Sequence, residues 1–490
     1  MGSTLSPPLH QQISWSVTLD RKELFPLSDA TGQRKARDEA DYLRVQNCKP
    51  QPGIDPDDQD ISVYPMLSDG AFINQLHGFH DILVKAVVDI IDRWWDDKAS
   101  NFSSRMPLEP QAEDILKWID KQSKNGSMPR IADCLGNWRP DFLLPHNEKR
   151  GSGQEFQICE INCRTPLNAV IHTAYKHEIM EDLLGTDSII EPAGSSKIMV
   201  DGLLENFDLD QPIHIVKGRD RLDRQEFIQL VELRTGLKPR LLDISDLHLK
   251  PDSSSHTGFA LYCNQENIET IDGAERVHQV ALALFPEEYS MLSPNMLRHL
   301  AMISVNDIRV CLFLNDQRFL GIILQELQGL SEKYGILTTD ETKILQEGIV
   351  STILPGSPEL ENIIKSITLA NGSLKDNFIL KAARSSRGNG HLMGDELSED
   401  EWKANLLRMQ DPTIREHTTS YVLQPYVKQP KFDIAVDKSR TIKDSLMVGT
   451  YYATNGLFAG LGPWRTSSGK ICNVHGGGCV LVNSITIRGI

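Results

Sequence analysis

Four clusters of polar and glycine residues have types and spacings suited to chemistry. The first contains Arg139 and Asp141, followed by Glu160 and Asn162. On a β-strand, Glu160 and Asn162 would point to one face, because side chains alternate with a period of two. Carboxylate and amide oxygens are ligands that Mg²⁺ accepts, and Asp141 on a neighbouring predicted strand can complete the set. The alternative is a hydrogen-bonded polar pair on an edge strand.

The second cluster follows a short apolar strand at 378–381, which ends in Lys381. Glycines in the next loop would let backbone N–H groups approach phosphate oxygens, and its cations would neutralise phosphate charge. The alternative is a mobile loop after an edge strand. The chain has neither a Walker-type phosphate loop nor a strand-linked G-x-G-x-x-G, which argues against a dinucleotide site. The loop residues are Arg384, Ser385, Arg387, Gly388, Asn389 and Gly390.

The third cluster is an apolar strand at 421–424 that leads into a connector with Gln424 and Tyr426. Apolar walls and connector backbone groups are what an adenine ring requires. An ordinary core strand would have the same pattern.

The fourth cluster begins with Arg465, which follows a strand and a turn, and continues to the glycine triplet 476–478. An arginine in this position can hold a carboxylate or an oxyanion. The triplet would form a lid over a reacting centre, or simply the turn of a hairpin.

The elements that must position these clusters change in character along the chain. Apolar spacing predicts a long helix at 73–95, begun by Ser68 or Asp69, and a second helix at 112–121. Strands at 141–144 and 155–162 would carry the first cluster. A β-α-β unit is expected over 213–244, because a helix at 224–234 separates two apolar runs. Further helices are expected at 173–184, near 276–284, at 294–304 and at 317–329, and the apolar run 308–314 has the length of a strand.

These patterns predict an α/β (α+β) protein with a mostly parallel middle and an antiparallel C-terminal part. The expected organisation is a polar lead segment at 1–60 and a helical region with the metal-binding strands at 61–200. An α/β substrate-type domain at 201–310 and a nucleotide-binding domain at 311–490 would follow.

Composition limits the classes of partner. The 490 residues include 51 Lys and Arg against 67 Asp and Glu, for a net charge of −16. This excess of acid argues against nucleic acid, because binding to phosphate backbones requires clustered cations. No apolar stretch has the roughly 18 residues of a membrane span. The eight cysteines form no C-x-x-C, which favours reduced thiols and a cytoplasmic protein.

The order of the clusters resembles the circularly permuted ATP-grasp ligases, such as eukaryotic glutathione synthetase and glutathionylspermidine synthetase. The similar stretches are LGNWRPDF at 135–142, ICEINCRTPL at 158–167 and GPWRTS at 462–467. Motif similarity covers residues 131–175 and 310–482. The resemblance implies an ATP-grasp fold, Mg²⁺, ATP as co-substrate and a homodimer. It also implies amide formation between a small carboxylic acid and an amine, as in divergent ligases of fungal secondary-metabolite pathways.

Carried onto this sequence, the resemblance implies a role for each cluster. Asp141, Glu160 and Asn162 would bind Mg²⁺. ATP would be bound by Lys381, Arg384, Ser385, Gly388, Asn389, Gly390, Gln424, Tyr426 and Arg318. The acid substrate would meet Arg139, Arg164, Thr165, Arg465 and Gly477, with Arg465 and Arg384 acting at the reacting groups.

Two positions depart from the family pattern. Ser385 stands where glutathione synthetases have a metal-binding glutamate, and Ser467 stands where they have an ATP-binding lysine. These departures argue against glutathione as the product. They also leave two other functions open: a nucleotide-binding protein without turnover, and a phosphotransferase on the same fold.

Overall fold

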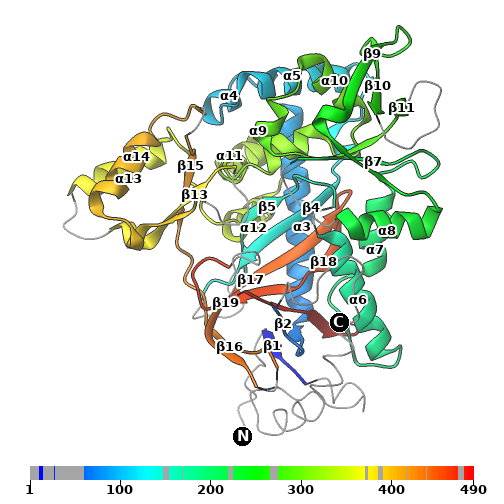
Figure 1. Cartoon of the computed structure of the whole chain (residues 1–490). Coiled ribbons are helices and arrows are strands. Elements are labelled where there is room, and N and C mark those ends of the chain that lie inside the picture. The colour runs from blue at the N-terminus through cyan, green and yellow to red at the C-terminus, as the bar shows by residue number, and fades with distance from the viewer. Residues whose placement is uncertain are drawn as a thin grey trace, which may run out of the picture.

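The computed structural model describes residues 10–14, 27, 60–146, 154–167, 169–218, 224–264, 274–369, 374–384, 390–415, 418–437, 439–472 and 479–489. Their central feature is an eight-stranded sheet in the order β2-β20-β19-β17-β4-β5, with β16 and β18 also paired to β17 (Figure 1). The sheet therefore joins strands from both halves of the chain. Its strands are β2 (Asp60–Ile61), β4 (Asn137–Leu143), β5 (Gln157–Asn162), β16 (Phe432–Ala435), β17 (Thr441–Thr454), β18 (Leu457–Leu461), β19 (Trp464–Ser467) and β20 (Val480–Val482).

The long helix α3 (Gly70–Asp92) packs against this sheet. The Asp69 side chain accepts a hydrogen bond from the backbone N–H of Ala71, which confirms the predicted start of the helix. Phe72 and Phe79 on the buried face contact the rings of sheet and loop aromatics. Burial of such large rings is a main source of stability in a core of this kind. The aromatic residues around Phe72 are Phe142, Phe156 and Trp464.

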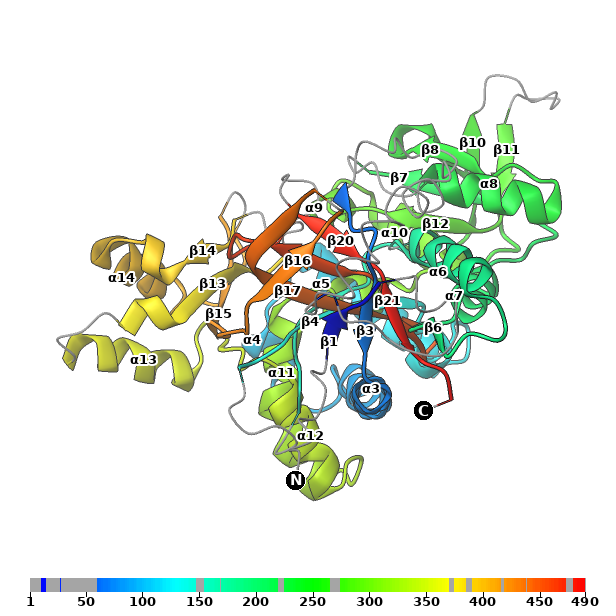
Figure 2. The same cartoon turned by 90° about the horizontal axis from the view of Figure 1, so that it is seen from below.

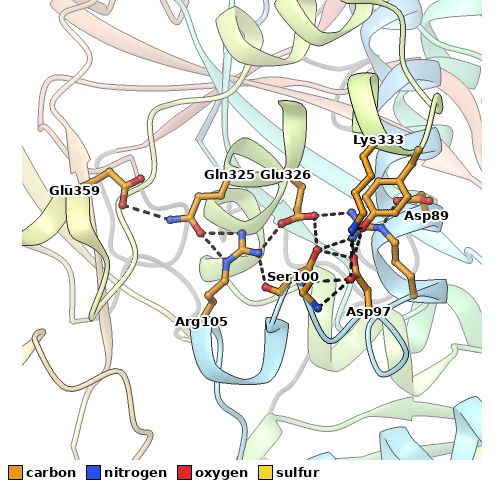
Figure 3. Close-up of polar contacts among 11 residues, drawn as sticks. Asp89, Asp97, Ser100, Arg105, Gln325, Glu326, Lys333 and Glu359 are labelled. Atoms are coloured by element: carbon orange, nitrogen blue, oxygen red, sulfur yellow. Dashed lines mark hydrogen bonds and ion pairs between the residues drawn. The ribbon is translucent and has the colours of Figure 1, made fainter. Parts of the chain in front are cut away.

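A network of ion pairs joins α3 to α11 (Arg318–Gln328) (Figure 3). Glu326 of α11 accepts from Arg93 at 2.6 Å and from Arg105 at 2.5 Å. Arg105 also bonds to Gln325, which donates to Glu359 of α13 (Pro358–Leu369). The network therefore holds the C-terminal end of α11, where Gln325 and Glu326 lie, against the body of the protein. Short helices nearby are α4 (Phe102–Arg105), α5 (Pro110–Lys124) and α12 (Thr339–Gly348).

Strand register brings the first cluster together. Asp141 lies opposite Glu160 on β5 and opposite Thr450 on β17. The neighbouring Gly449 lets β17 approach β4 closely, because a Cβ there would lie 2.1 Å from the ring of Phe142. Gly449 thus determines how closely β17, with Thr450, approaches Asp141 on β4.

The middle of the chain contains two small sheets, on the opposite side of the central sheet from α13 and α14 (Glu399–Arg408) (Figure 2). The predicted β-α-β unit is confirmed as β7 (His214–Lys217), α8 (Arg224–Thr235) and β8 (Arg240–Asp243). The strand β12 (Val280–Ala283) completes the parallel sheet β12-β7-β8. The other sheet is antiparallel, so the middle is less parallel than expected. Its strands are β9 (Leu247–Pro251), β10 (Phe259–Asn264) and β11 (Ala274–Val277).

Two predictions from short apolar runs were wrong. The expected helix near 276–284 is two strands, β11 and β12, and all four residues of β12 are buried. The run 308–314, which has the length of a strand, instead contains the π-helical turn η4 (Val310–Leu314). Periodicity does not separate a short buried strand from a short buried helix, because both have apolar residues on every side.

A third small sheet, the antiparallel β14-β13-β15, carries the second and third clusters and is covered by α13 and α14. In both views it lies at one side of the central sheet (Figures 1 and 2). Its strands are β13 (Phe378–Ala382), β14 (Leu392–Met393) and β15 (Tyr421–Pro425), as the sequence predicted for β13 and β15.

The remaining sheet has the order β1-β3-β21-β6 and packs on α6 (Val170–Leu184). Within the described ranges, no helix is long and apolar enough to cross a bilayer. The strands of this sheet are β1 (His10–Gln12), β3 (Met66–Ser68), β6 (Ile190–Pro192) and β21 (Ser484–Ile487). Three further helices are α7 (Ser196–Leu204), α9 (Pro286–Tyr289) and α10 (Pro294–Ile303).

Candidate functional site

The structure brings Asp141, Glu160 and Asn162 together at the junction of β4 and β5. The Asn162 amide nitrogen donates to Asp141 Oδ2 and to Glu160 Oε1, at 3.1 Å in both cases. Asp141 is 0% exposed. The two carboxylates therefore converge on a single amide group within a buried part of the sheet.

Cations from distant parts of the chain surround the carboxylates. Arg465 Nη2 lies 2.5 Å from Asp141 Oδ2, and Lys381 Nζ lies 3.6 Å from Glu160 Oε2. Lys381 also donates to the carbonyl oxygen of Cys159 at 2.8 Å. Thr450 donates to Asp141 Oδ1 at 2.7 Å. β19, β13 and β17 thus each supply a group to the pair of acids.

Burial and charge move the pKa values of the two acids in opposite directions. Burial raises the pKa of Asp141 above its usual range, and the adjacent Glu160 charge adds to this effect, although Arg465 opposes it. Burial acts in the same sense on Glu160, but the Lys381 ammonium and nearby hydrogen bonds bring its pKa well below the usual range. The Lys381 ammonium thus favours the anionic form of Glu160.

This donor set fits a small divalent cation. Two carboxylates and an amide converge here and offer hard oxygen ligands. The amide of Asn162 can present its oxygen by rotating about its terminal bond. Asp141, Glu160 and Asn162 would be the residues that hold Mg²⁺.

The predicted phosphate-binding residues are only partly within the described ranges. Ser385, Gly388 and Asn389 lie outside them, whereas Gly390 has a positive φ of 75° beside Ala382. Arg384 is ion-paired with Asp316 at 2.7 Å and with Glu109 at 2.5 Å. A phosphate would therefore have to compete with two carboxylates for the Arg384 guanidinium.

Arg318 occupies a different position from the one expected. Its side chain is 0% exposed, and it bonds to Asp316 and to the carbonyl oxygen of Pro107. Asp316 in turn holds Arg384. Arg318 thus supports Asp316 from within the core, and its direct contact with ATP stays a prediction.

The predicted adenine connector comprises the end of β15, where Gln424 lies, and the residues that follow, beginning with Tyr426. The buried Gln424 donates to the hydroxyl of Thr352 at 2.9 Å, and the backbone N–H of Tyr426 donates to the carbonyl oxygen of Asn377 at 2.7 Å. Gln424 pairs with Ile379 of β13, so the connector lies beside the strand that carries Lys381.

The predicted substrate-binding residues lie at different distances from the acids. Arg139 Nε is 3.7 Å from Asp141 Oδ1. The Arg164 guanidinium packs 3.9 Å over the ring of Phe285, and Thr165 is buried. Gly477 lies outside the described residues.

Sequence reasoning missed several residues of the site. Thr450 and Gln317 contact the two acids, and His391 accepts from the N–H of Ala382. Burial and the charge of Lys381 lower the pKa of His391 to about 4. Of these residues, only Gln317 is marked in the sequence, because it directly precedes Arg318 of the resemblance.

A second group of metal-binding residue types lies in the middle region, where His214, Cys263 and Glu275 place ligand atoms within 4.8 Å of one another. The guanidinium of Arg240 contacts Glu275 directly. An arginine is thus already paired with the carboxylate of this group, as Arg465 is with Asp141.

Comparison with known proteins identifies relatives over most of the chain. Residues 79–313 match the family model described as the AnkG N-terminal domain. The chain is 36% identical over 430 residues to the ATP-grasp enzyme ankG of Aspergillus thermomutatus, covering 85% of this chain and 87% of the relative. Among solved structures, it is similar to a glutathione synthetase-like effector from Globodera pallida, with a TM-score of 0.47 and 12% identity over 86% of this chain and 89% of the other.

Proposed function

Because the chain belongs to the family of the ATP-grasp enzyme ankG, we propose that it is an ADP-forming ligase that joins a carboxylic acid to an amine. The observation that carries the proposal is the 3.6 Å contact between Lys381 and Glu160. It joins the strand that leads into the glycine-rich loop to the pair of acids on the central sheet. A nucleotide phosphate and a divalent cation would meet at this point.

Each residue has a part in the proposed reaction. Lys381 would bind a phosphate oxygen of ATP and hold the γ-phosphate in line with the substrate carboxylate. Mg²⁺ held by Asp141, Glu160 and Asn162 would neutralise phosphate charge. The carboxylate oxygen would form a bond to the γ-phosphorus as the bond to ADP breaks, which gives an acyl phosphate.

The second half of the reaction forms the amide. An amine attacks the acyl carbon, the bond to phosphate breaks, and the amine proton leaves to solvent or a nearby base. Arg465, held beside Asp141, would stabilise the negative charge on the acyl oxygen. Arg139 would help to bind the acid substrate, since its guanidinium lies at the same cluster.

We extend the proposal to a tailoring step in secondary metabolism, with amino-acid-like acid and amine substrates. The support for this extension is the resemblance of the sequence motifs to divergent fungal ligases. A screen of acid and amine pairs for ADP release, with mass detection of the product, tests it. A ligase requires both substrates and gives a product whose mass is their sum less one water. A phosphotransferase would give a stable phosphorylated product without an amine, and a binding protein would give no ADP.

A further inference from the structure

We infer that Gln317 supplies a further oxygen ligand to the cation site formed by Asp141, Glu160 and Asn162. This inference rests on the proposed function, because it concerns the metal that the proposal places there. Gln317 lies immediately before α11 and is 7% exposed. Its backbone N–H donates to the carbonyl oxygen of Ala383 at 2.8 Å, which ties it to the end of the strand that carries Lys381.

The two ends of the Gln317 amide have different surroundings. The nitrogen Nε2 donates to Glu160 Oε2 at 3.2 Å. The oxygen Oε1 is buried, and no donor among the described residues reaches it. The reverse orientation would place the amide oxygen against the carboxylate, so the electrostatics favour the orientation observed.

A buried acceptor without a donor is costly, at about 1–3 kcal/mol, and buried polar atoms are rarely left in that state. Oε1 shares one carbon with the nitrogen that contacts Glu160, so it lies at the edge of the acid cluster. A phosphate oxygen would be repelled there, because both groups are acceptors. The missing partner must therefore bring positive charge or a proton.

A divalent cation meets this requirement best. The neighbouring groups are carboxylates and a second amide, which are the ligand types of Mg²⁺ and Mn²⁺. Gln317 would thus have two roles at the site, since its amide nitrogen orients Glu160 and its amide oxygen contacts the ion. A merely orienting role would use the nitrogen alone.

Substitution by glutamate separates these two roles. Gln317→Glu keeps an oxygen at the position of the acceptor but removes the N–H donor and adds a negative charge beside Glu160. If the oxygen binds the ion, this variant binds it at least as tightly as the wild type. If only the N–H donor matters, the same variant loses the group that orients Glu160 and binds the ion as weakly as Gln317→Leu does.

The experiment is a titration of the full-length protein with Mn²⁺ alone, in which electron paramagnetic resonance measures the free ion. We expect Gln317→Leu to weaken Mn²⁺ binding roughly tenfold or more. Gln317→Glu should match or exceed the wild-type affinity. The matched controls are Gln328→Leu and Gln328→Glu. Gln328 is the last residue of α11 and makes an exposed contact with Glu332, so both variants should leave the affinity unchanged.

Three results would contradict either the role of Gln317 or the metal site itself. Weaker Mn²⁺ binding by Gln317→Glu, or unchanged binding by Gln317→Leu, would overturn the inference about Gln317. If Glu160→Gln still abolished Mn²⁺ binding in that case, the proposed metal site would stand. Equal Mn²⁺ binding by Glu160→Gln and the wild type would reject the metal site itself. Glu275→Gln serves as the check on the His214 group, and it should not change the affinity of the Glu160-dependent site.

Discussion

The carboxylate of Asp141 and the guanidinium of Arg465 lie 2.5 Å apart and join β4 to β19 across the intervening strand β17. Thr450 of β17 lies between the two strands. Its hydroxyl donates to Asp141 at 2.7 Å and lies 3.5 Å from Arg465. The pair is thus fixed by three strands that come from distant parts of the chain.

Removal of Arg465 should destabilise the fold as well as the site. Arg465→Leu leaves the buried Asp141 without its closest cation, which we expect to cost about 3–5 kcal/mol in the free energy of unfolding. The double variant Asp141→Asn/Arg465→Leu should recover part of this loss in urea denaturation. The exposed pair of Arg415 and Asp411 is the control, and Arg415→Leu should cost less than about 1 kcal/mol. Equal losses at the two arginines would contradict the burial argument.

Loss of Lys381 should weaken ATP binding. Lys381→Ala removes a buried ammonium that contacts Glu160 and the Cys159 carbonyl oxygen. One charge-assisted contact to phosphate is worth about 1.5–3 kcal/mol, so calorimetry should show roughly 10–100-fold weaker binding. Lys403→Ala, at an exposed lysine of α14, should bind ATP normally. Normal affinity in Lys381→Ala would exclude the proposed phosphate contact.

Gly449 should resist substitution. A Cβ at this position would meet the Phe142 ring at 2.1 Å, so Gly449→Ala must push β17 away from β4. We expect a loss of about 1–3 kcal/mol, measured by thermal denaturation. Gly78→Ala on the exposed face of α3 is the matched control, and it should stabilise by up to about 1 kcal/mol because nothing lies within 4 Å. A neutral result at Gly449 would mean that strand spacing does not depend on this residue.

Acid should destabilise the protein partly through His80. The ring bonds to the Tyr451 hydroxyl and the Gly456 carbonyl oxygen, and burial lowers its pKa from 6.5 to about 4. The unfolded chain therefore binds the proton more readily, and stability falls as the pH drops from about 6.5 towards 4. One such histidine accounts for about 2 kcal/mol between pH 7 and pH 5.

The control for this effect is His80→Gln, which keeps a neutral polar side chain. Its free energy of unfolding should change less between pH 7 and pH 5 than that of the wild type, whatever its absolute stability. Identical changes in the two proteins would show that His80 is not protonated on unfolding.

The sequence was sufficient for the strands that carry the acids and for membership in the ATP-grasp enzymes. The period-two pattern placed Glu160 and Asn162 on one face, and register then brought Asp141 opposite Glu160. The organisation of the chain into four regions stays a prediction. The region that includes β4 and β5 shares its sheet with β17 and β19 of the last region.

Long-range contacts were beyond sequence reasoning. Nothing in the local pattern shows that Asp316 holds both Arg318 and Arg384, or that Glu109 is a partner of Arg384. Such pairs depend on how loops from different elements meet. The sequence therefore predicted that Arg318 binds ATP, whereas in the structure its buried guanidinium pairs with Asp316.

The most direct test of the proposed ligase follows the oxygen atoms. Acid substrates with ¹⁸O in the carboxylate are supplied with ATP, Mg²⁺ and an amine, and the inorganic phosphate is analysed by mass spectrometry. Attack of the carboxylate on the γ-phosphate predicts one ¹⁸O atom in each phosphate released with amide formation, and no such phosphate from Glu160→Gln. Phosphate without ¹⁸O, released as the amide forms, would contradict an acyl phosphate intermediate.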